Sequence, residues 1–208
     1  MRDKTHLIFD MDGTLIDSSQ LLANTINYVR QKIGLSKLEE GRIIEALNDT
    51  SINPAQFYYE TETFEPIHER YFQEYYLQNH ERQSRLYEGM AELLEALSQE
   101  RKLAVATNAY DLSARPLLQN LGIDRYFDIV MCADLVPKPK PHPHMLEAII
   151  TFYGTGRARF VMIGDGHRDI EAAENAGIAA LLVEWGFSSH EGAVTSVTEL
   201  AEILGVAI

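Results

Sequence analysis

Five short apolar segments rich in β-forming residues recur along this chain, and they constrain its fold more than any other feature. They are Thr5–Asp10, Lys102–Thr107, Phe127–Cys132, Arg159–Gly164 and Gly177–Glu184. Most are nearly continuous apolar runs rather than alternating apolar and polar ones. Such runs are typical of strands that are buried on both faces of a parallel sheet.

Segments with helical periodicity separate these strands. In the segment 88–100, the residues Met90, Leu93, Leu94 and Leu97 fall on one helical face. Similar segments are Leu112–Leu121, Met145–Phe152, Arg168–Asn175 and Ser196–Leu204. Regular alternation of strand and helix predicts an α/β fold with a Rossmann-like, doubly wound parallel sheet.

The alternation is interrupted once, between the first strand and the second, where we find no convincing strand. Two amphipathic helices and one or two longer helices are expected there, at Leu21–Gly34, Leu38–Leu47 and Ala55–His80. We therefore predict two domains. The α/β core comprises residues 1–17 and 87–208, and an inserted all-helical cap comprises residues 18–86.

The charge balance excludes some partners. The chain has 31 acidic against 18 basic residues, a formal net charge of −13. A surface this acidic repels nucleic-acid phosphates and anionic lipids, so we expect neither nucleic acid nor membrane as a partner. An anionic substrate would need a local positive group, such as a metal ion.

The chain is expected to act in the cytoplasm. It shows no signal peptide and no apolar run of the roughly 18 residues that a membrane span requires. Its single cysteine, Cys132, fits a reducing compartment. We expect a mature chain from Met1 that is a monomer or a homodimer.

Polar and charged residues gather where the predicted strands end. The first strand ends in Asp10-Met11-Asp12-Gly13-Thr14, the second in Thr107-Asn108 and the fourth in Gly164-Asp165 with Asp169 nearby, while the third leads to a Lys/Pro-rich stretch that contains Lys140. Ligands of open α/β sheets bind at the carboxyl ends of the strands. Adjacent carboxylates repel each other unless a cation lies between them, and Mg²⁺ prefers oxygen ligands and substrate phosphate.

These motifs together resemble those of the haloacid dehalogenase-like hydrolases. The stretch Asp10-Met11-Asp12-Gly13-Thr14-Leu15-Ile16-Asp17-Ser18 is similar to the first motif of that family almost letter for letter. Thr107-Asn108, Lys140 before Pro141, and Gly164-Asp165 with Asp169 follow in the family's order. The resemblance covers the whole chain, including a helical cap after the first motif.

The resemblance implies a role for each matching residue. Asp10 is the expected nucleophile, which forms an aspartyl-phosphate, and Asp12 the expected acid and base for the leaving alcohol and the attacking water. The Asp10 carboxylate, the Asp12 carbonyl and Asp165 would hold Mg²⁺, and Asp169 would either support the metal or orient Lys140. The substrate phosphate would be bound by the loop and strand-end residues Gly13, Thr14, Thr107, Asn108 and Lys140.

The resemblance leaves more than one function open. The favoured interpretation is that the chain is a Mg²⁺-dependent phosphatase for a small phosphorylated metabolite, such as phosphoglycolate or a sugar or nucleotide monophosphate. The presence of Asp12 disfavours carbon–halogen cleavage, which has no alkoxide leaving group to protonate. A phosphosugar mutase of the β-phosphoglucomutase type remains an alternative, and a non-catalytic binding or regulatory module a remote one.

Overall fold

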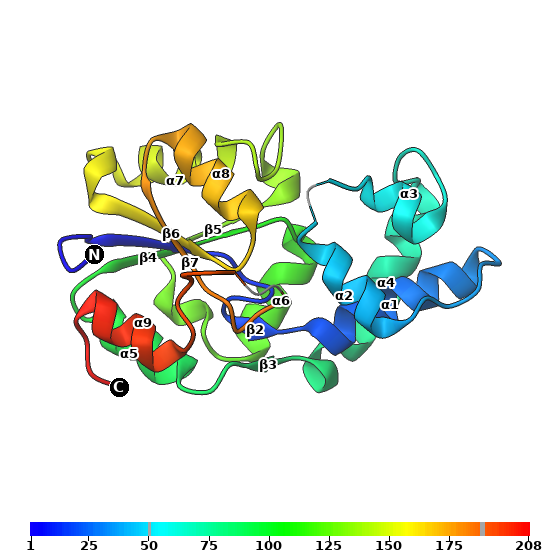
Figure 1. Ribbon diagram of the computed structural model, residues 1–208, viewed down its shortest axis with the longest axis horizontal. Helices are drawn as coiled ribbons and strands as arrows, with labels where there is room; N and C mark the ends of the chain where they lie inside the picture. Colours follow the sequence, from blue (N-terminus) through cyan, green and yellow to red (C-terminus); the bar gives the residue numbers. More distant parts are fainter. Residues whose placement is uncertain (50, 188–189) are drawn as a thin grey trace. The chain divides into compact units, whose positions relative to one another are not determined.

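The computed structural model describes residues 1–49, 51–187 and 190–208 (Figure 1). The chain divides into two compact units. The first unit consists of Met1–Asp17 with Arg85–Ile208, and the second of Ser18–Ser84. Each unit contains its own cluster of buried apolar side chains. Among the described residues, no helix is both long and apolar enough to cross a bilayer.

A five-stranded parallel sheet forms the centre of the first unit. Its strands are β1 (His6–Phe9), β4 (Lys102–Thr107), β5 (Ile129–Cys132), β6 (Phe160–Gly164) and β7 (Ala179–Leu182). Their order is β5-β4-β1-β6-β7, and every neighbouring pair is parallel. All five strands predicted from the sequence are confirmed.

Helices cover both faces of this sheet (Figure 1). On the β5 side of β1, α5 (Met90–Ser98) precedes β4 and α6 (Asp111–Asn120) precedes β5. On the β7 side, α7 (His144–Tyr153) precedes β6 and α8 (His167–Ala176) precedes β7. Right-handed crossovers in opposite directions place these two pairs on opposite faces. The last helix, α9 (Val197–Leu204), packs beside α5. The sheet is therefore doubly wound, as predicted.

The strands of the sheet are buried from both sides. Ile8 and Met162 belong to the cluster that includes residues of α7 and α8. Leu7 and Phe9 alternate with Ile8 along β1 and so point to the opposite face, where they too are fully buried. Burial on both faces explains why the sequence shows continuous apolar runs at these strands.

The described residues of the second unit form four helices. They are α1 (Ser19–Lys32), α2 (Glu40–Leu47), α3 (Pro54–Tyr59) and α4 (Pro66–Gln83). Buried residues of the first three helices, such as Ile26, Ile43 and Tyr58, form its core, and Tyr71 and Phe72 of α4 pack against them. The predicted helical stretch 55–80 is thus two helices, because α3 ends at Glu60 in a left-handed conformation with φ +61°.

A short antiparallel pair was not predicted. It joins β2 (Ile16–Asp17) to β3 (Arg85–Leu86), with Arg85 Nη2 lying 2.9 Å from Asp17 Oδ2. These two-residue strands lie on either side of the inserted helices in the sequence. Arg85 and Leu86 therefore belong with the first unit, although the predicted cap extends to residue 86.

Candidate active site

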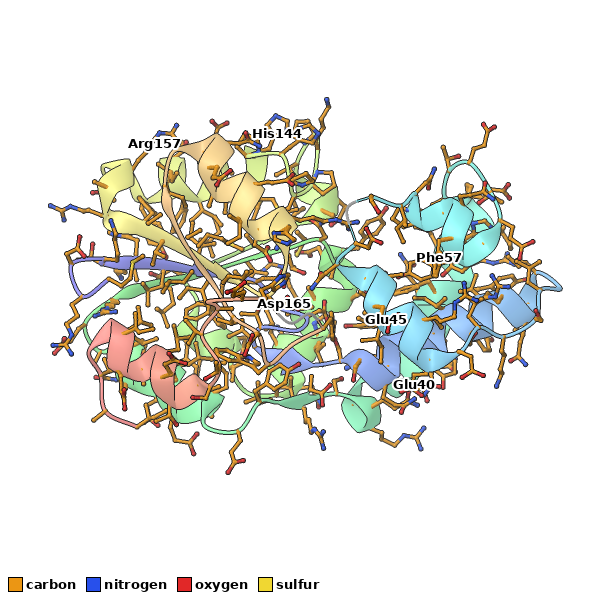
Figure 2. All side chains as sticks on the ribbon, in the orientation of Figure 1. Glu40, Glu45, Phe57, His144, Arg157 and Asp165 are labelled. Carbon is orange, nitrogen blue, oxygen red and sulfur yellow. The ribbon has the colours of Figure 1, made fainter. Side chains whose placement is uncertain are left out.

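The carboxyl ends of β1 and β6 bring the first and last sequence motifs together. The strand order reverses between these two neighbouring strands, which is where open α/β sheets bind their ligands. Asp10 directly follows β1, and its backbone N–H donates to the carbonyl of Ile163 in β6 at 2.8 Å. Asp165 directly follows β6 and lies inside the first unit (Figure 2).

Lys140 lies between two aspartates. Its Nζ atom is 2.6 Å from Asp10 Oδ1 and 2.6 Å from Asp169 Oδ1. The side chains of Lys140, Asp169 and Asp10 are 3%, 5% and 12% exposed, so Asp10 is the most accessible of the three. The contact with Lys140 is made by Asp10 Oδ1.

Burial and charge act against each other on these groups. Burial raises the pKa of Asp10 well above its usual value, although Lys140 opposes this shift. For Lys140, burial acts to lower the pKa, but Asp10 and Asp169 together raise it above its usual value. The lysine is therefore a permanent cation at the site.

Three buried carboxylates form a cluster that suits a divalent cation. One oxygen each of Asp10, Asp165 and Asp169 lies within 4.8 Å of the others, among the described residues. Three carboxylates against a single ammonium group leave an excess of negative charge, which a cation would neutralise. An all-oxygen donor set of this kind fits Mg²⁺, which binds through one or two carboxylates together with water and phosphate.

The strand-end residues Thr107 and Asn108 adjoin the lysine. Asn108 Nδ2 donates to the Lys140 carbonyl and Asn108 Oδ1 accepts from the Lys140 N–H, both at 3.0 Å. Thr107 is buried, and its Oγ1 accepts from the N–H of Ala109 at 3.0 Å. The Asn108 side chain thus holds the backbone that carries the lysine, a contact that sequence reasoning did not anticipate.

The loop that follows Asp10 packs tightly against Asp165. The carboxylate of Asp12 is not a member of the three-carboxylate cluster of the described residues. Gly13 has φ +84°, and its N–H donates to the Ile16 carbonyl at 2.9 Å. Thr14 is fully buried, with its Oγ1 lying 3.4 Å from Asp165 Oδ1. Gly13 and Thr14 therefore shape the turn beside the carboxylates.

One segment of the site gave no signal in the sequence. After β7, the chain places the Trp185 indole N–H 3.0 Å from the Thr14 carbonyl and the Phe187 N–H 2.9 Å from Asp165 Oδ2. These are a single indole donor and a single backbone donor, and neither belongs to a periodic or charged pattern. The one available hint was that Trp185 is the only tryptophan of the chain.

Several named proteins align with most of this chain. The profile of the haloacid dehalogenase-like hydrolases matches residues 7–183. A phosphoglycolate phosphatase from Agrobacterium fabrum is 33% identical over 189 residues, which is 87% of this chain and 81% of that protein. The pyrophosphatase PpaX from Listeria monocytogenes is 30% identical over 196 residues, 90% of this chain and 86% of that protein.

Solved structures agree with these relatives. A predicted phosphoglycolate phosphatase from Haemophilus somnus has a TM-score of 0.77 at 30% identity, covering 89% of this chain and 88% of its own. A haloacid dehalogenase-like family protein from Streptococcus pneumoniae shares the fold, with a TM-score of 0.82 at 24% identity and 99% of both chains covered. With its motifs gathered at one edge of the sheet, this chain belongs to the haloacid dehalogenase-like hydrolase family.

Proposed function

We propose that this hydrolase is a Mg²⁺-dependent phosphatase that acts on a small phosphorylated metabolite through an aspartyl-phosphate on Asp10. The observation that carries the proposal is the placement of Asp10. One of its oxygens is held by Lys140 at 2.6 Å, and the carboxyl group is the most accessible member of the charged cluster. A carboxylate fixed in this way is suited to nucleophilic attack.

The reaction can be written from the residues of the chain. An Asp10 oxygen attacks phosphorus, a new O–P bond forms, and the bond from phosphorus to the alcohol oxygen breaks. Asp12 donates a proton to the departing alkoxide and then accepts one from the water that cleaves the aspartyl-phosphate. Phosphate and a free Asp10 carboxylate result. Lys140 stabilises the negative charge on the phosphoryl oxygens throughout.

Mg²⁺ would be held by the carboxylates of Asp10 and Asp165 and by the Asp12 carbonyl. When bound, the ion neutralises charge on the phosphate and orients it for in-line attack. Asp169 is placed differently. Its Oδ1 accepts from the Lys140 ammonium at 2.6 Å and its Oδ2 accepts from the Gly166 N–H at 3.2 Å, so it connects the lysine to the N-terminus of α8. We infer that Asp169 positions Lys140 instead of binding the metal directly.

The names of the relatives narrow the substrate class. One is named for phosphoglycolate and another for pyrophosphate, and both substrates are small, strongly anionic compounds. A chain of net charge −13 repels such a substrate, but Lys140 together with a bound cation would make the electrostatic potential at the site positive. Small phosphorylated acids and pyrophosphate are therefore the first substrates to test.

The decisive assay is phosphate release with and without Mg²⁺ over phosphoglycolate, pyrophosphate, sugar monophosphates and nucleoside monophosphates. Asp10→Asn is expected to lower the turnover of any substrate by about four orders of magnitude, as loss of a nucleophile does. Asp124→Asn, the same change at an exposed aspartate, is the matched control. Phosphate release that survives Asp10→Asn would contradict the proposal, and interconversion of hexose phosphate isomers without release would favour the mutase.

A further inference from the structure

The segment Trp185–Phe187, which follows β7, contacts the candidate metal site at two points. The Trp185 indole N–H donates to the Thr14 carbonyl at 3.0 Å, and the Phe187 backbone N–H donates to Asp165 Oδ2 at 2.9 Å. The first contact fixes the loop that follows Asp10, and the second fixes the Asp165 carboxylate itself. In the sequence, Trp185 is 171 residues from Thr14 and Phe187 is 22 residues from Asp165.

Gly186 lies between these two contacts and allows the segment to pass close to Gly13 and Asp165. A Cβ atom on Gly186 would lie 2.1 Å from the Gly13 carbonyl oxygen and 2.5 Å from Asp165 Oδ2. Gly186 does not have a positive φ, so the need for glycine at this position is one of space and not of backbone conformation. A side chain here would have to displace backbone on one side or the carboxylate on the other.

The Asp165 carboxylate is consequently enclosed between two glycines. A Cβ atom on Gly13 would lie 2.3 Å from the same Oδ2 atom. Thr14 Oγ1 lies 3.4 Å from the other oxygen, Oδ1. Both carboxylate oxygens therefore have a donor from the chain, which fixes the plane of the carboxylate.

We propose that Trp185, Gly186 and the Phe187 N–H are positioning groups that orient Asp165 for Mg²⁺. This inference rests on the proposed function, since it assumes that Asp165 holds the metal. Groups that orient a metal ligand affect metal affinity without touching the metal. A change in this segment is therefore expected to weaken Mg²⁺ binding in a protein that remains folded.

The test is isothermal titration calorimetry with Mg²⁺ on the native protein and on three variants. Gly186→Ala should raise the Mg²⁺ dissociation constant by about 10- to 100-fold, the range for lost support of a metal ligand. Trp185→Phe keeps an aromatic ring but removes the N–H donor, and should raise the constant by roughly 2- to 10-fold, as for one neutral hydrogen bond. Gly156→Ala is the matched control, because a Cβ there meets nothing within 4 Å and its φ is not positive.

Circular dichroism and the melting temperature show whether each variant is folded. If Gly186→Ala does not fold, the Mg²⁺ affinity of Trp185→Phe alone tests the inference. If Gly186→Ala and Trp185→Phe are folded and bind Mg²⁺ within about twofold of the native protein, the inference is overturned, because the loss of orienting groups should weaken Mg²⁺ binding by more than that. If phosphate release is normal in those variants and lost in Asp10→Asn, only this inference fails. If the native protein releases no phosphate but Gly186→Ala still weakens Mg²⁺ binding, the proposed function fails and the inference stands.

Discussion

Asp165 and Asp169 are both buried aspartates near the end of β6, yet their surroundings differ. Asp169 accepts hydrogen bonds from Lys140 and from its own helix N-terminus at Gly166. Asp165 accepts from Phe187 and Thr14, and neither donor carries a charge. Asp10 shares this lysine but has a more accessible side chain, 12% exposed against 5% for Asp169. Asp165 and Asp169 are therefore expected to respond differently to the same substitution.

We predict that Asp169→Asn lowers kcat by about 10- to 100-fold, the range for groups that orient a catalytic or metal-binding partner. The amide would hold Lys140 less firmly, so the lysine would stabilise the phosphoryl charge less well. The Mg²⁺ dissociation constant should change only a few-fold, whereas Asp165→Asn should raise it by at least about 10-fold. Kinetics and calorimetry on both variants separate these effects. Equal losses of Mg²⁺ affinity would show that Asp169 binds the metal directly.

The residues at the site differ in how far sequence reasoning could find them. Asp10 and Asp165 were predicted because a charged side chain directly after a buried strand stands out from its surroundings. Lys140 was predicted from the resemblance to the family motif, in which it precedes Pro141. The contacts of Trp185 and Phe187 were not, since an indole N–H and a backbone N–H can pair with any carbonyl or carboxylate. The close approach of Gly186 to Gly13 depends on how two distant segments pack. No local pattern in the sequence encodes such packing.

Among the elements, the long regular ones were predicted and the short ones were not. The five strands of the sheet have four residues or more and carry apolar runs of at least three, which is enough for burial on both faces to be visible. β2 and β3 have two residues each, too few to show any periodicity. The division between α3 and α4 depends on the backbone of Glu60, a residue that ordinarily favours a continuing helix.

A buried arginine connects the elements of the second unit. Arg30 lies in α1 and is 3% exposed. Its Nε donates to the Ser36 carbonyl at 2.6 Å, its Nη1 to the Tyr58 carbonyl at 2.5 Å, and its Nη2 lies 3.3 Å from Glu60 Oε1. One side chain thus satisfies carbonyls that follow α1 and end α3. The helices of this unit depend on it in a way that apolar packing alone does not provide.

We expect Arg30→Leu to destabilise the second unit by about 2–4 kcal/mol, because the buried Tyr58 carbonyl, the Ser36 carbonyl and the Glu60 carboxylate would lose their charged donor. Arg82→Leu, the same change at an exposed position, should shift the free energy of unfolding by less than about 0.5 kcal/mol. Urea denaturation followed by circular dichroism measures both. An Arg30 variant as stable as the Arg82 variant would show that the three hydrogen bonds contribute nothing net.

At the scale of the whole molecule, the excess of negative charge bears on stability as well as on function. The chain carries a formal net charge of −13, and three of its carboxylates are buried close together beside a single lysine. Such a cluster opposes folding unless a cation is present. An ion that binds the native cluster but not the unfolded chain stabilises the fold by mass action.

Mg²⁺ is therefore expected to raise the melting temperature of the protein. At about 100 times its dissociation constant, the ion should contribute roughly 2.7 kcal/mol. For a chain of this size, that corresponds to about 5–10 °C. If the two units melt separately, only the transition of the first unit should move, because the clustered carboxylates all belong to it. Differential scanning calorimetry with and without Mg²⁺ resolves both transitions. Asp165→Asn should remove most of the shift and Asp124→Asn none of it. A shift that Asp165→Asn leaves intact would place the cation elsewhere on this acidic surface.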